Sequence, residues 1–287
     1  MSIKHSILAS SFLPLKIRNN VFNILKSKPK GRLRVLIYHD IAKENEELFL
    51  RQLSFLKQNW NFINTSTFSD MISGQQPIES DSLLLTFDDG FISCRNVAET
   101  VLKRLDIKAL FFIVSDFVSL TGDDWRPFVA KKINPHMQPE NVPDYCRNMS
   151  LDDLGYLLEQ GHTIGGHTAN HARLSQLSGR DLEKEIIDSA DNLEKMLSIS
   201  VNHFAYTFGN LASFSPEALA VARRRFKYIY TGFRGNNSVL PLPWAICRDS
   251  IKPEDSNYLA GAFLEGGADR LYSKDCDVFR AWGHDVV

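Results

Sequence analysis

The chain has 287 residues, 44% of them hydrophobic, and its 33 basic and 34 acidic residues leave a formal net charge of -1. This length suits one large α/β domain with a short appendage, because single α/β barrels run to roughly 200–250 residues. The balanced charge gives no electrostatic reason to expect a nucleic-acid partner, and no apolar run approaches the ~20 residues of a membrane-spanning helix, so we expect a soluble body.

The N-terminal segment differs from the rest in charge. Residues 1–34 contain eight Lys or Arg and no acidic residue, and because the other 25 basic residues share the chain with 34 acidic ones, the remainder carries about -9. Ile17, Val21, Ile24 and Leu25 recur in this segment at helical spacing. Such a basic helix either lies on an anionic membrane surface, as a peripheral contact, or docks on the outside of the fold.

Two further features bear on the compartment. The stretch "SILASSFLPL" is interrupted by serines and Pro14, and no small-x-small cleavage site follows it, so no clear cleavable signal peptide is predicted. The four cysteines have no Cys-x-x-Cys spacing, which favours a reducing compartment and predicts neither a zinc knuckle nor a thioredoxin-type pair. We expect a cytoplasmic protein, or one peripheral to the membrane, with a basic extension at 1–32 and one domain at 33–287.

From residue 33 the pattern alternates between strand and helix. "RVLIYHD" (34–40) is typical of a short buried strand that ends in polar residues, and Phe49, Leu53 and Leu56 share one face of the helix after it. A further strand and a short helix precede "LLLTFDDGF" (83–91), which reads as a buried strand that ends in two carboxylates. The helix "VAETVLKRL" and the apolar strand "KALFFIV" (108–114) follow.

The second half continues this alternation, with recognisable helix caps. Ser150, with Asp153 three residues on, begins one helix, and Ser178 and the pair Ser215–Pro216 begin two more. Between and after these helices lie the predicted strands "HTIGGH", "HFAYTFG" and "YIYTGF". Repeated strand, helix and strand units predict a parallel sheet, and about seven or eight of them predict closure into a barrel.

Polar side chains gather at the predicted carboxyl ends of these strands, where the catalytic groups of such barrels lie. The candidates are His39 and Asp40, Asp88 and Asp89, His167 and His171, and Tyr206 with Phe208. We expect them to share one mouth of the barrel.

The Asp88–Asp89–Gly90 sequence has two interpretations. Asp-Gly is a strong reverse-turn dipeptide that would simply end the strand. Alternatively, the carboxylates belong to a metal site, because His167 and His171 are spaced four apart, about one helical turn, and both rings can then face one cation. Two imidazoles and one carboxylate would leave an open position for water, as a catalytic divalent ion requires.

At this point the sequence resembles a known family. "TFDDG" and "HTANH", the latter following "GHTIGG", look like the first two signature motifs of the polysaccharide deacetylases, the carbohydrate esterase family 4-like enzymes with a NodB homology domain. "FAYTFG" resembles the third motif, with Thr207 where a proline is usual. "YHDI" followed by "QLSFLKQ" is similar to the branch that acts on extracellular or cell-envelope glycans. The resemblance covers roughly residues 34–235.

The resemblance implies an α/β fold of the distorted, incomplete (β/α) barrel type and a metal-dependent hydrolase. Its substrate would be an acetylated glycan or polysaccharide, and the bond cleaved a carbon–nitrogen amide bond, not a peptide bond, if the group is N-acetyl. Carried over residue by residue, it implies Asp89, His167 and His171 as ligands of a divalent metal, Zn²⁺ first, with Co²⁺ or another divalent ion as alternatives. Asp88 would be the general base that takes a proton from the attacking water.

The resemblance also implies how the substrate is held. A backbone amide in the segment from Tyr206 to Gly209 would stabilise the oxyanion, which makes Tyr206, Phe208 and Gly209 expected substrate-binding residues. Trp125, Tyr206 and Trp244 are candidates for stacking on sugar rings, although burial in the core is the usual role of any one aromatic residue.

The late part of the chain departs from the family pattern. A late motif commonly offers a histidine as general acid, yet the only histidine after residue 203 is His284, so His39 is the expected substitute. Arg248 and Asp249 either belong to a late strand that orients the base or form an ordinary surface ion pair.

Two other classes compete with the deacetylase. A phosphatase of the haloacid-dehalogenase type also ends a strand in acidic residues, but it needs Asp-x-Asp, so the adjacent pair in "FDDG" disfavours it. A catalytically weak or inactive glycan-binding relative is the stronger rival, supported by the missing late histidine and opposed by the retained ligands and base. Of the other polar residues, His162 is expected to be structural and Thr168 to support the site by a hydrogen bond.

Overall fold

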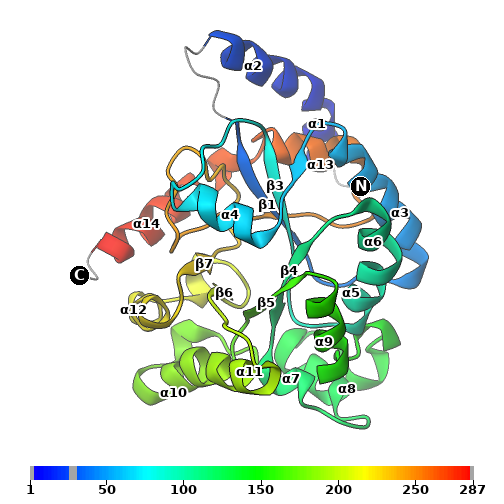
Figure 1. The fold of residues 1–287 in the computed structure, drawn as a ribbon, viewed down its shortest axis with the longest axis vertical. Coiled ribbons are helices and arrows are strands. Elements are labelled where there is room, and N and C mark those ends of the chain that lie inside the picture. Colours follow the sequence, from blue (N-terminus) through cyan, green and yellow to red (C-terminus); the bar gives the residue numbers. More distant parts are fainter. Residues whose placement is uncertain (1–2, 26–30, 285–287) are drawn as a thin grey trace.

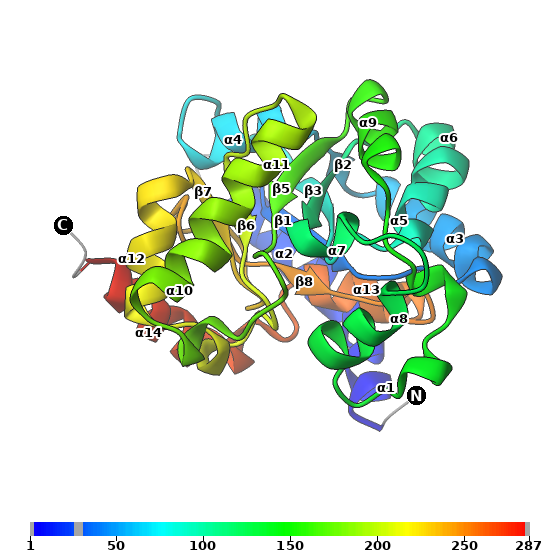
Figure 2. The same cartoon turned by 90° about the horizontal axis from the view of Figure 1, so that it is seen from below.

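A computed structural model describes residues 3–25 and 31–284, and its centre is a curved parallel sheet surrounded by helices (Figures 1 and 2). The sheet has eight strands in the order β7-β6-β5-β4-β3-β1-β8, with β2 paired to β3 off this path. The strands are β1 Leu33–Tyr38, β2 Asn61–Phe62, β3 Ser82–Phe87, β4 Ala109–Ile113, β5 Thr163–Gly166, β6 His203–Ala205, β7 Tyr228–Tyr230 and β8 Asp249–Ser250.

The helices follow the predicted alternation. They are α1 Ile3–Ser10, α2 Phe12–Leu25, α3 Glu46–Lys57, α4 Thr65–Ile72, α5 Ile92–Val97, α6 Lys103–Leu105, α7 Ser115–Val118, α8 Trp125–Phe128, α9 Leu151–Glu159, α10 Gly179–Glu183, α11 Ser189–Leu197, α12 Pro216–Arg225, α13 Asn257–Leu264 and α14 Ser273–His284. Turns of π-helix at 98–102 and 184–188 join α5 to α6 and α10 to α11. None of the helices in these described ranges is both long and apolar enough to cross a membrane.

The barrel is incomplete, as the resemblance implied. Each strand pairing is parallel, and β7 and β8 are the two ends of the path. The gap between β7 and β1 is bridged by the segment before β8, because Ile246 pairs with Tyr230 and Asp249 then pairs with Leu36. The late chain therefore closes the barrel with only a few residues, which distorts it.

Strand alternation divides the core into two layers. Val35, Leu84 and Phe112 belong to the smaller cluster inside the barrel, whereas their sequence neighbours Leu85 and Phe111 belong to the larger cluster beneath the helices. In β3 the inward positions are the even-numbered ones, so the next inward position after residue 86 is residue 88. This register directs the side chain of Asp88 into the barrel.

The predicted helix caps are present for two of the three helices. Ser150 and Asp153 form a reciprocal capping box at the start of α9, and the Ser215 hydroxyl accepts a hydrogen bond from the amide of Ala218 in α12. Ser178 precedes α10 but makes no side-chain cap.

Two of the four cysteines meet in the tertiary structure. The Cys247 and Cys276 sulfur atoms lie 3.9 Å apart, although 29 residues separate them. Their sequence spacing carried no sign of this contact.

Two buried histidines make the fold sensitive to acid. Nδ1 of His162 accepts a hydrogen bond from the Ala109 amide, which gives it the structural role expected of it. Burial, with Lys108 nearby, lowers the pKa of His162 to about 4, and burial, with Lys227 nearby, lowers the pKa of His203 to about 3.

Unfolding should therefore become easier below neutral pH. The unfolded chain takes up protons near pH ~6.5, whereas these two folded rings do not, so their contribution to stability is complete above that pH and is lost as pH falls towards the folded pKa values. By pH 5 each ring should remove up to about 2 kcal/mol from the free energy of unfolding. Urea unfolding at pH 7 and pH 5 measures the difference. A His203→Asn variant should show a shallower pH dependence, and an unchanged slope would contradict the assignment.

Candidate active site

Asp88 lies at the end of β3 and is buried in the barrel. Both of its carboxylate oxygens accept hydrogen bonds from Arg248, at 2.7 Å from Nη1 and 3.0 Å from Nη2. Burial by itself would raise the pKa of Asp88, but the charge of the Arg248 guanidinium lowers it below the usual range. Asp88 is therefore an ionised carboxylate that Arg248 holds in one orientation.

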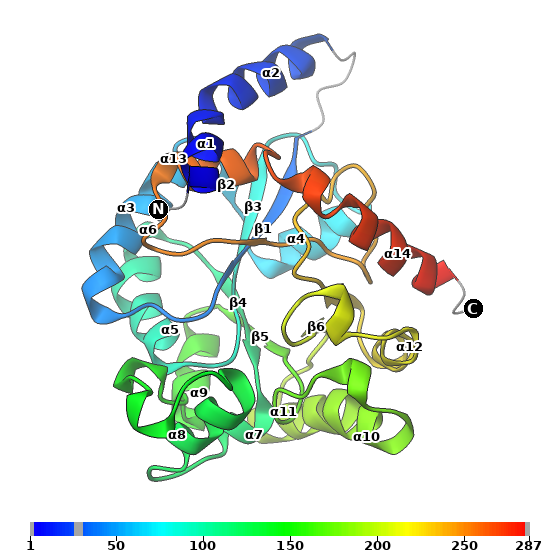
Figure 3. The same ribbon diagram turned by 180° about the vertical axis from the view of Figure 1, so that it is seen from behind.

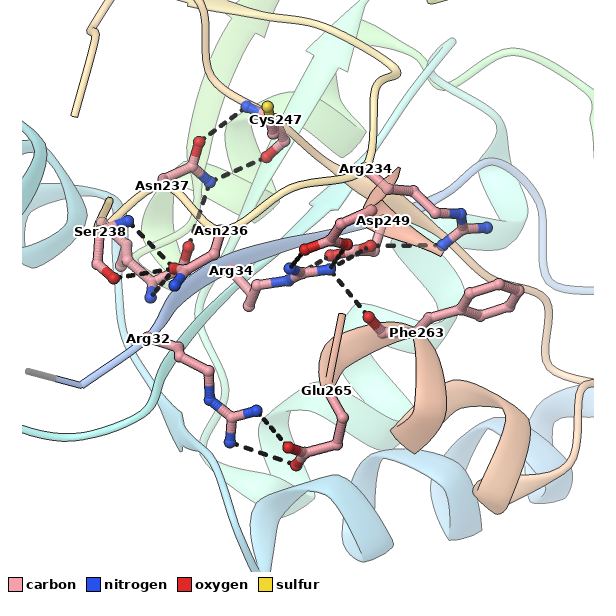
Figure 4. Close-up of polar contacts among 12 residues, drawn as sticks. Arg32, Arg34, Arg234, Asn236, Asn237, Ser238, Cys247, Asp249, Phe263 and Glu265 are labelled. Atoms are coloured by element: carbon pink, nitrogen blue, oxygen red, sulfur yellow. Dashed lines mark hydrogen bonds and ion pairs between the residues drawn. The ribbon is translucent and has the colours of Figure 1, made fainter. Parts of the chain in front are cut away.

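The residues on either side of Arg248 are held just as firmly (Figure 4). The Asn237 side chain accepts a hydrogen bond from the Cys247 amide at 2.8 Å and donates one to the Cys247 carbonyl at 3.0 Å. Asp249 receives two hydrogen bonds from Arg34, each 2.8 Å long. Of the two interpretations of Arg248 and Asp249, the structure supports the late strand, because Arg248 binds Asp88 and neither residue belongs to a surface ion pair.

Asp89 occupies the turn that follows Asp88. Its φ of 73° and the φ of 96° at Gly90 show that the predicted Asp-Gly turn does form. The turn and the metal-site interpretations are compatible, because this left-handed conformation also places the Asp89 carboxylate next to the histidines. Oδ1 of Asp89 lies 3.4 Å from Nε2 of His167 and 3.4 Å from Nε2 of His171.

The two histidines converge from a loop, not from a helical turn as their spacing suggested. His167 follows β5 directly, and Thr168 and His171 have φ values of 67° and 59°. The Thr168 hydroxyl accepts a hydrogen bond from the His171 amide at 3.0 Å, which is the supporting role expected of it. Left-handed residues are unfavourable unless their surroundings hold them, and such strain gathers at functional sites.

Glu185 is a supporting residue that the sequence analysis missed. Its buried carboxylate accepts hydrogen bonds from the backbone amides of Ala169 and Asn170, both at 3.1 Å, and so holds the histidine loop from the helical side. An acidic residue between Leu182 and Ile186, on the apolar stripe of that helix, was the available signal.

The donor set fits a divalent metal. Nδ1 of His167 lies 2.6 Å from the Ala205 carbonyl and Nδ1 of His171 lies 2.9 Å from the Lys132 carbonyl. Carbonyl oxygens only accept, so each Nδ1 carries a proton. In this tautomer each ring, in its neutral form, turns the lone pair of Nε2 towards Asp89.

The Nε2 lone pairs of His167 and His171 face a carboxylate oxygen of Asp89. Oδ1 of Asp89 is buried and has no hydrogen-bond partner among the described residues. One ligand atom from each of the three residues lies within 4.8 Å of the others. Three acceptors that face one point repel each other unless a cation lies between them. Metal bonds of about 2.0–2.1 Å in tetrahedral geometry separate neighbouring ligands by about 3.4 Å, which agrees with the observed carboxylate–imidazole spacing.

A cavity of about 550 Å³ opens in front of this cluster. Both aspartates, both histidines and Arg248 line it. The segment 129–146 supplies a second wall that the sequence analysis did not anticipate, and segment 250–254 supplies a third. The additional lining residues include Val129, Ile133, Asn134, Met137, Tyr145, Cys146, Lys252 and Glu254.

Phe208 and Gly209 line the cavity, as expected for substrate-binding residues. The Phe208 ring is 38% exposed and lies 4.7 Å from the His171 ring, between centroids. Gly209 is required because its φ is 66° and a Cβ there would lie 2.9 Å from the Gly232 Cα. Thr207, at the position where a proline is usual, donates a hydrogen bond of 2.5 Å to the Ala172 carbonyl and ties this loop to the histidine loop.

Three aromatic residues considered for sugar stacking lie outside the cavity lining. Tyr206 is 1% exposed and its ring stacks on Phe214, so neither face is open to a sugar. Trp125 is 3% exposed and belongs to the core. Trp244 faces the Arg223 guanidinium at 5.0 Å, beside Gly283 of α14. The structure corrects the expectation for Tyr206 and Trp244, because packing on the late helix occupies both rings.

His39 follows β1 and lies at the mouth, as expected. It is exposed and lines the cavity, together with its neighbour Asp40. Within the described chain, His39, His167 and His171 are the histidines of the cavity lining. His39 is thus the one histidine of the lining that lies outside the cluster of Asp89, His167 and His171.

Known proteins resemble this chain in sequence and in fold. The model of the family described as "Polysaccharide deacetylase" matches residues 75–225. YxkH of Bacillus subtilis (strain 168), a curated protein assigned to the polysaccharide deacetylases, is 21% identical over 248 residues, which cover 84% of this chain and 79% of YxkH.

Solved structures show the same fold. The Streptococcus pyogenes deacetylase PplD, in complex with acetate, superimposes with a TM-score of 0.66 at 22% identity, covering 82% of this chain and 99% of PplD. IcaB from Ammonifex degensii superimposes with a TM-score of 0.65 at 22% identity, covering 82% of this chain and 98% of IcaB. Because the family match spans more than half of the chain, and fold and motifs agree with it, the protein belongs to the polysaccharide deacetylase family.

Proposed function

We propose that the protein is a metal-dependent hydrolase that removes acetyl groups, N-acetyl in the first place, from a glycan or polysaccharide. One observation carries this proposal: the orphaned Asp89 oxygen and two bare imidazole nitrogens converge beside an ionised Asp88, at the floor of one cavity. This arrangement combines a three-ligand metal site with a carboxylate base that stays free of the metal.

Asp89, His167 and His171 would hold the metal. A divalent cation, zinc first and cobalt as the alternative, would supply Lewis-acid polarisation of the acetyl carbonyl and a lowered pKa for the attacking water. The carbonyl oxygens of Ala205 and Lys132 keep both rings in the ligating tautomer.

Asp88 accepts the proton of the attacking water. Arg248 fixes the carboxylate in one orientation and favours its ionised form, so Asp88 remains a base at neutral pH. Arg248 acts through Asp88 and is a positioning residue. The substrate acetyl group must then enter between Asp88 and the wall formed by Phe208 and Gly209.

His39 is the proposed general acid that gives a proton to the departing nitrogen as the carbon–nitrogen bond breaks. A His39→Gln variant should release acetate from N-acetyl sugars at least ~100-fold more slowly, which is the lower end of the usual worth of a positioned acid. It should hydrolyse p-nitrophenyl acetate within a few fold of the parent, because a nitrophenolate leaves without protonation. Equal losses on both substrates would contradict the assignment to leaving-group protonation.

The function itself is tested by acetate release from a panel of acetylated oligosaccharides, with N-acetyl and O-acetyl members assayed separately. Release should be abolished by a chelator and restored by added zinc or cobalt. The rival, a glycan-binding relative without turnover, would bind members of the panel yet release no acetate with either metal. That outcome would overturn the proposed activity while leaving the family assignment intact.

A further inference from the structure

The N-terminal helices α1 and α2 dock on the body through one face. Phe12 is 6% exposed, and its ring lies 5.7 Å from the Tyr258 ring and 5.9 Å from the Phe55 ring, between centroids. A Cβ on Gly261 of α13 would lie 2.5 Å from the Phe12 ring, so the two helices are in close contact. This packing agrees with one of the two expectations for the segment, a helix docked on the fold.

A polar contact fixes the orientation of α2. The Asn19 side chain donates hydrogen bonds to the Glu265 carboxylate at 2.7 Å and to the Glu265 carbonyl at 3.0 Å. Glu265 also forms an ion pair with Arg32, the residue before β1 (Figure 4). The inward face of α2, which carries Phe12 and Asn19, is thus fully engaged.

The outward face of the same helices is apolar and exposed. Leu13, Ile17 and Val21 lie four residues apart and form one line on α2. Their exposed fractions are 57%, 63% and 48%, and Ile7 of α1 is 65% exposed. We call these four residues the outer ridge. The inward face is apolar because it packs on the body and holds the helix in place. The outward apolar face packs against nothing in the described part of the chain.

The charge of the N-terminal segment indicates the partner of the outer ridge. Residues 1–31 contain six basic and no acidic residues. Arg32 and Arg34 are not available to such a partner, because they form ion pairs with Glu265 and Asp249 of the body. A second copy of this segment would bring together two strongly positive surfaces. An anionic bilayer offers a complementary negative charge for the basic residues and an acyl boundary for the apolar ones, as interfacial helices require.

We propose that the outer ridge binds the surface of an anionic membrane. Leu13, Ile17 and Val21 enter the boundary between headgroups and acyl chains, and the exposed Arg18 beside them contacts the headgroups. Because α2 is already helical and docked, no ordering of this helix is needed on binding.

The placement of α2 suits such a role. It stands at the periphery of the molecule in Figures 1 and 3, far from α9 and α10. Through Glu265 it reaches Arg32 at the beginning of β1, whereas the cavity lies at the carboxyl ends of the strands.

The test is co-sedimentation of the full chain with vesicles. The protein should bind vesicles of phosphatidylcholine mixed with phosphatidylglycerol, and it should bind vesicles of phosphatidylcholine alone much more weakly. It should dissociate from the vesicles that contain phosphatidylglycerol as the salt concentration is raised. The triple variant Leu13→Gln, Ile17→Gln and Val21→Gln should lose at least ~10-fold in vesicle affinity. Far-UV circular dichroism and thermal unfolding establish that the variant remains folded.

Leu151→Gln is the matched control, because Leu151 is a 40% exposed leucine on α9, remote from α2 in Figures 1 and 3. It should bind vesicles like the parent. The proposal is overturned if the parent ignores the anionic vesicles at low salt, or if the triple variant binds them as well as the parent does. It is also overturned if sedimentation velocity finds a dimer that the triple variant alone abolishes, because the ridge would then join two copies.

Discussion

Replacing Asp88 with asparagine should slow acetate release by about 10²–10⁴-fold, the usual worth of a positioned general base. The substitution keeps the size of the side chain and removes its capacity to accept a proton. Metal content should stay stoichiometric, because Asp88 is not among the three residues whose ligand atoms converge. Turnover of an acetylated oligosaccharide and metal analysis of the same preparation provide the two measurements.

The loss of charge at Asp88 also leaves the buried Arg248 without its ionic partner, so the variant should unfold at a lower temperature than the parent. Assays are therefore run well below that temperature. Asp116→Asn is the matched control, since Asp116 is an exposed aspartate that does not line the cavity. A variant at position 88 that hydrolyses acetylated sugars as fast as the parent would refute the role of base.

Asp89→Asn should weaken metal binding by at least ~10-fold. Loss of a residue that only hydrogen-bonds to a metal ligand already weakens binding by that much, and Asp89 is a proposed ligand itself. An amide oxygen replaces a carboxylate oxygen and brings no negative charge to the cation. Activity should be low at stoichiometric metal and should partly return in excess metal, since Asp88 and Arg248 are unchanged. Metal titrations followed by activity and by direct metal analysis measure both effects.

His162→Asn is the control for this experiment. It removes a buried histidine that lies outside the cavity lining, and it should leave metal affinity unaltered. If excess metal rescued the variant at position 88 and not the one at position 89, the two aspartates would exchange roles. Wild-type metal affinity in Asp89→Asn would show that the cluster of Asp89, His167 and His171 holds no metal.

Much of the site was predictable because its residues lie in short motifs at the ends of strands. The hydrophobic runs before Asp88 and before His167 predicted buried parallel strands, and the carboxyl ends of such strands share one edge of a sheet. The motifs "TFDDG" and "HTANH" then identified the ligand candidates. Local sequence was sufficient here because strand register and a tight turn place these side chains.

The same local reasoning was wrong where long-range packing decides. Spacing of four suggested a helical turn for His167 and His171, whereas the loop reaches the same convergence through left-handed residues held by Glu185. Tyr206 and Trp244 had the chemistry for sugar stacking, but the late helix α14 packs against them. Whether an aromatic ring faces a cavity or a core depends on elements far along the chain, so its own neighbourhood carries little signal.

The sequence by itself determined the alternation of strands and helices, the family, and the candidate ligands, because hydrophobic periodicity and motif spacing are local properties. Only the tertiary structure decided that Arg248, 160 residues after Asp88, donates hydrogen bonds to that carboxylate from Nη1 and Nη2. It alone showed that the basic N-terminal helix uses one apolar face for docking and exposes another. Both results depend on which distant surfaces meet, and the folded packing of the whole chain selects those contacts.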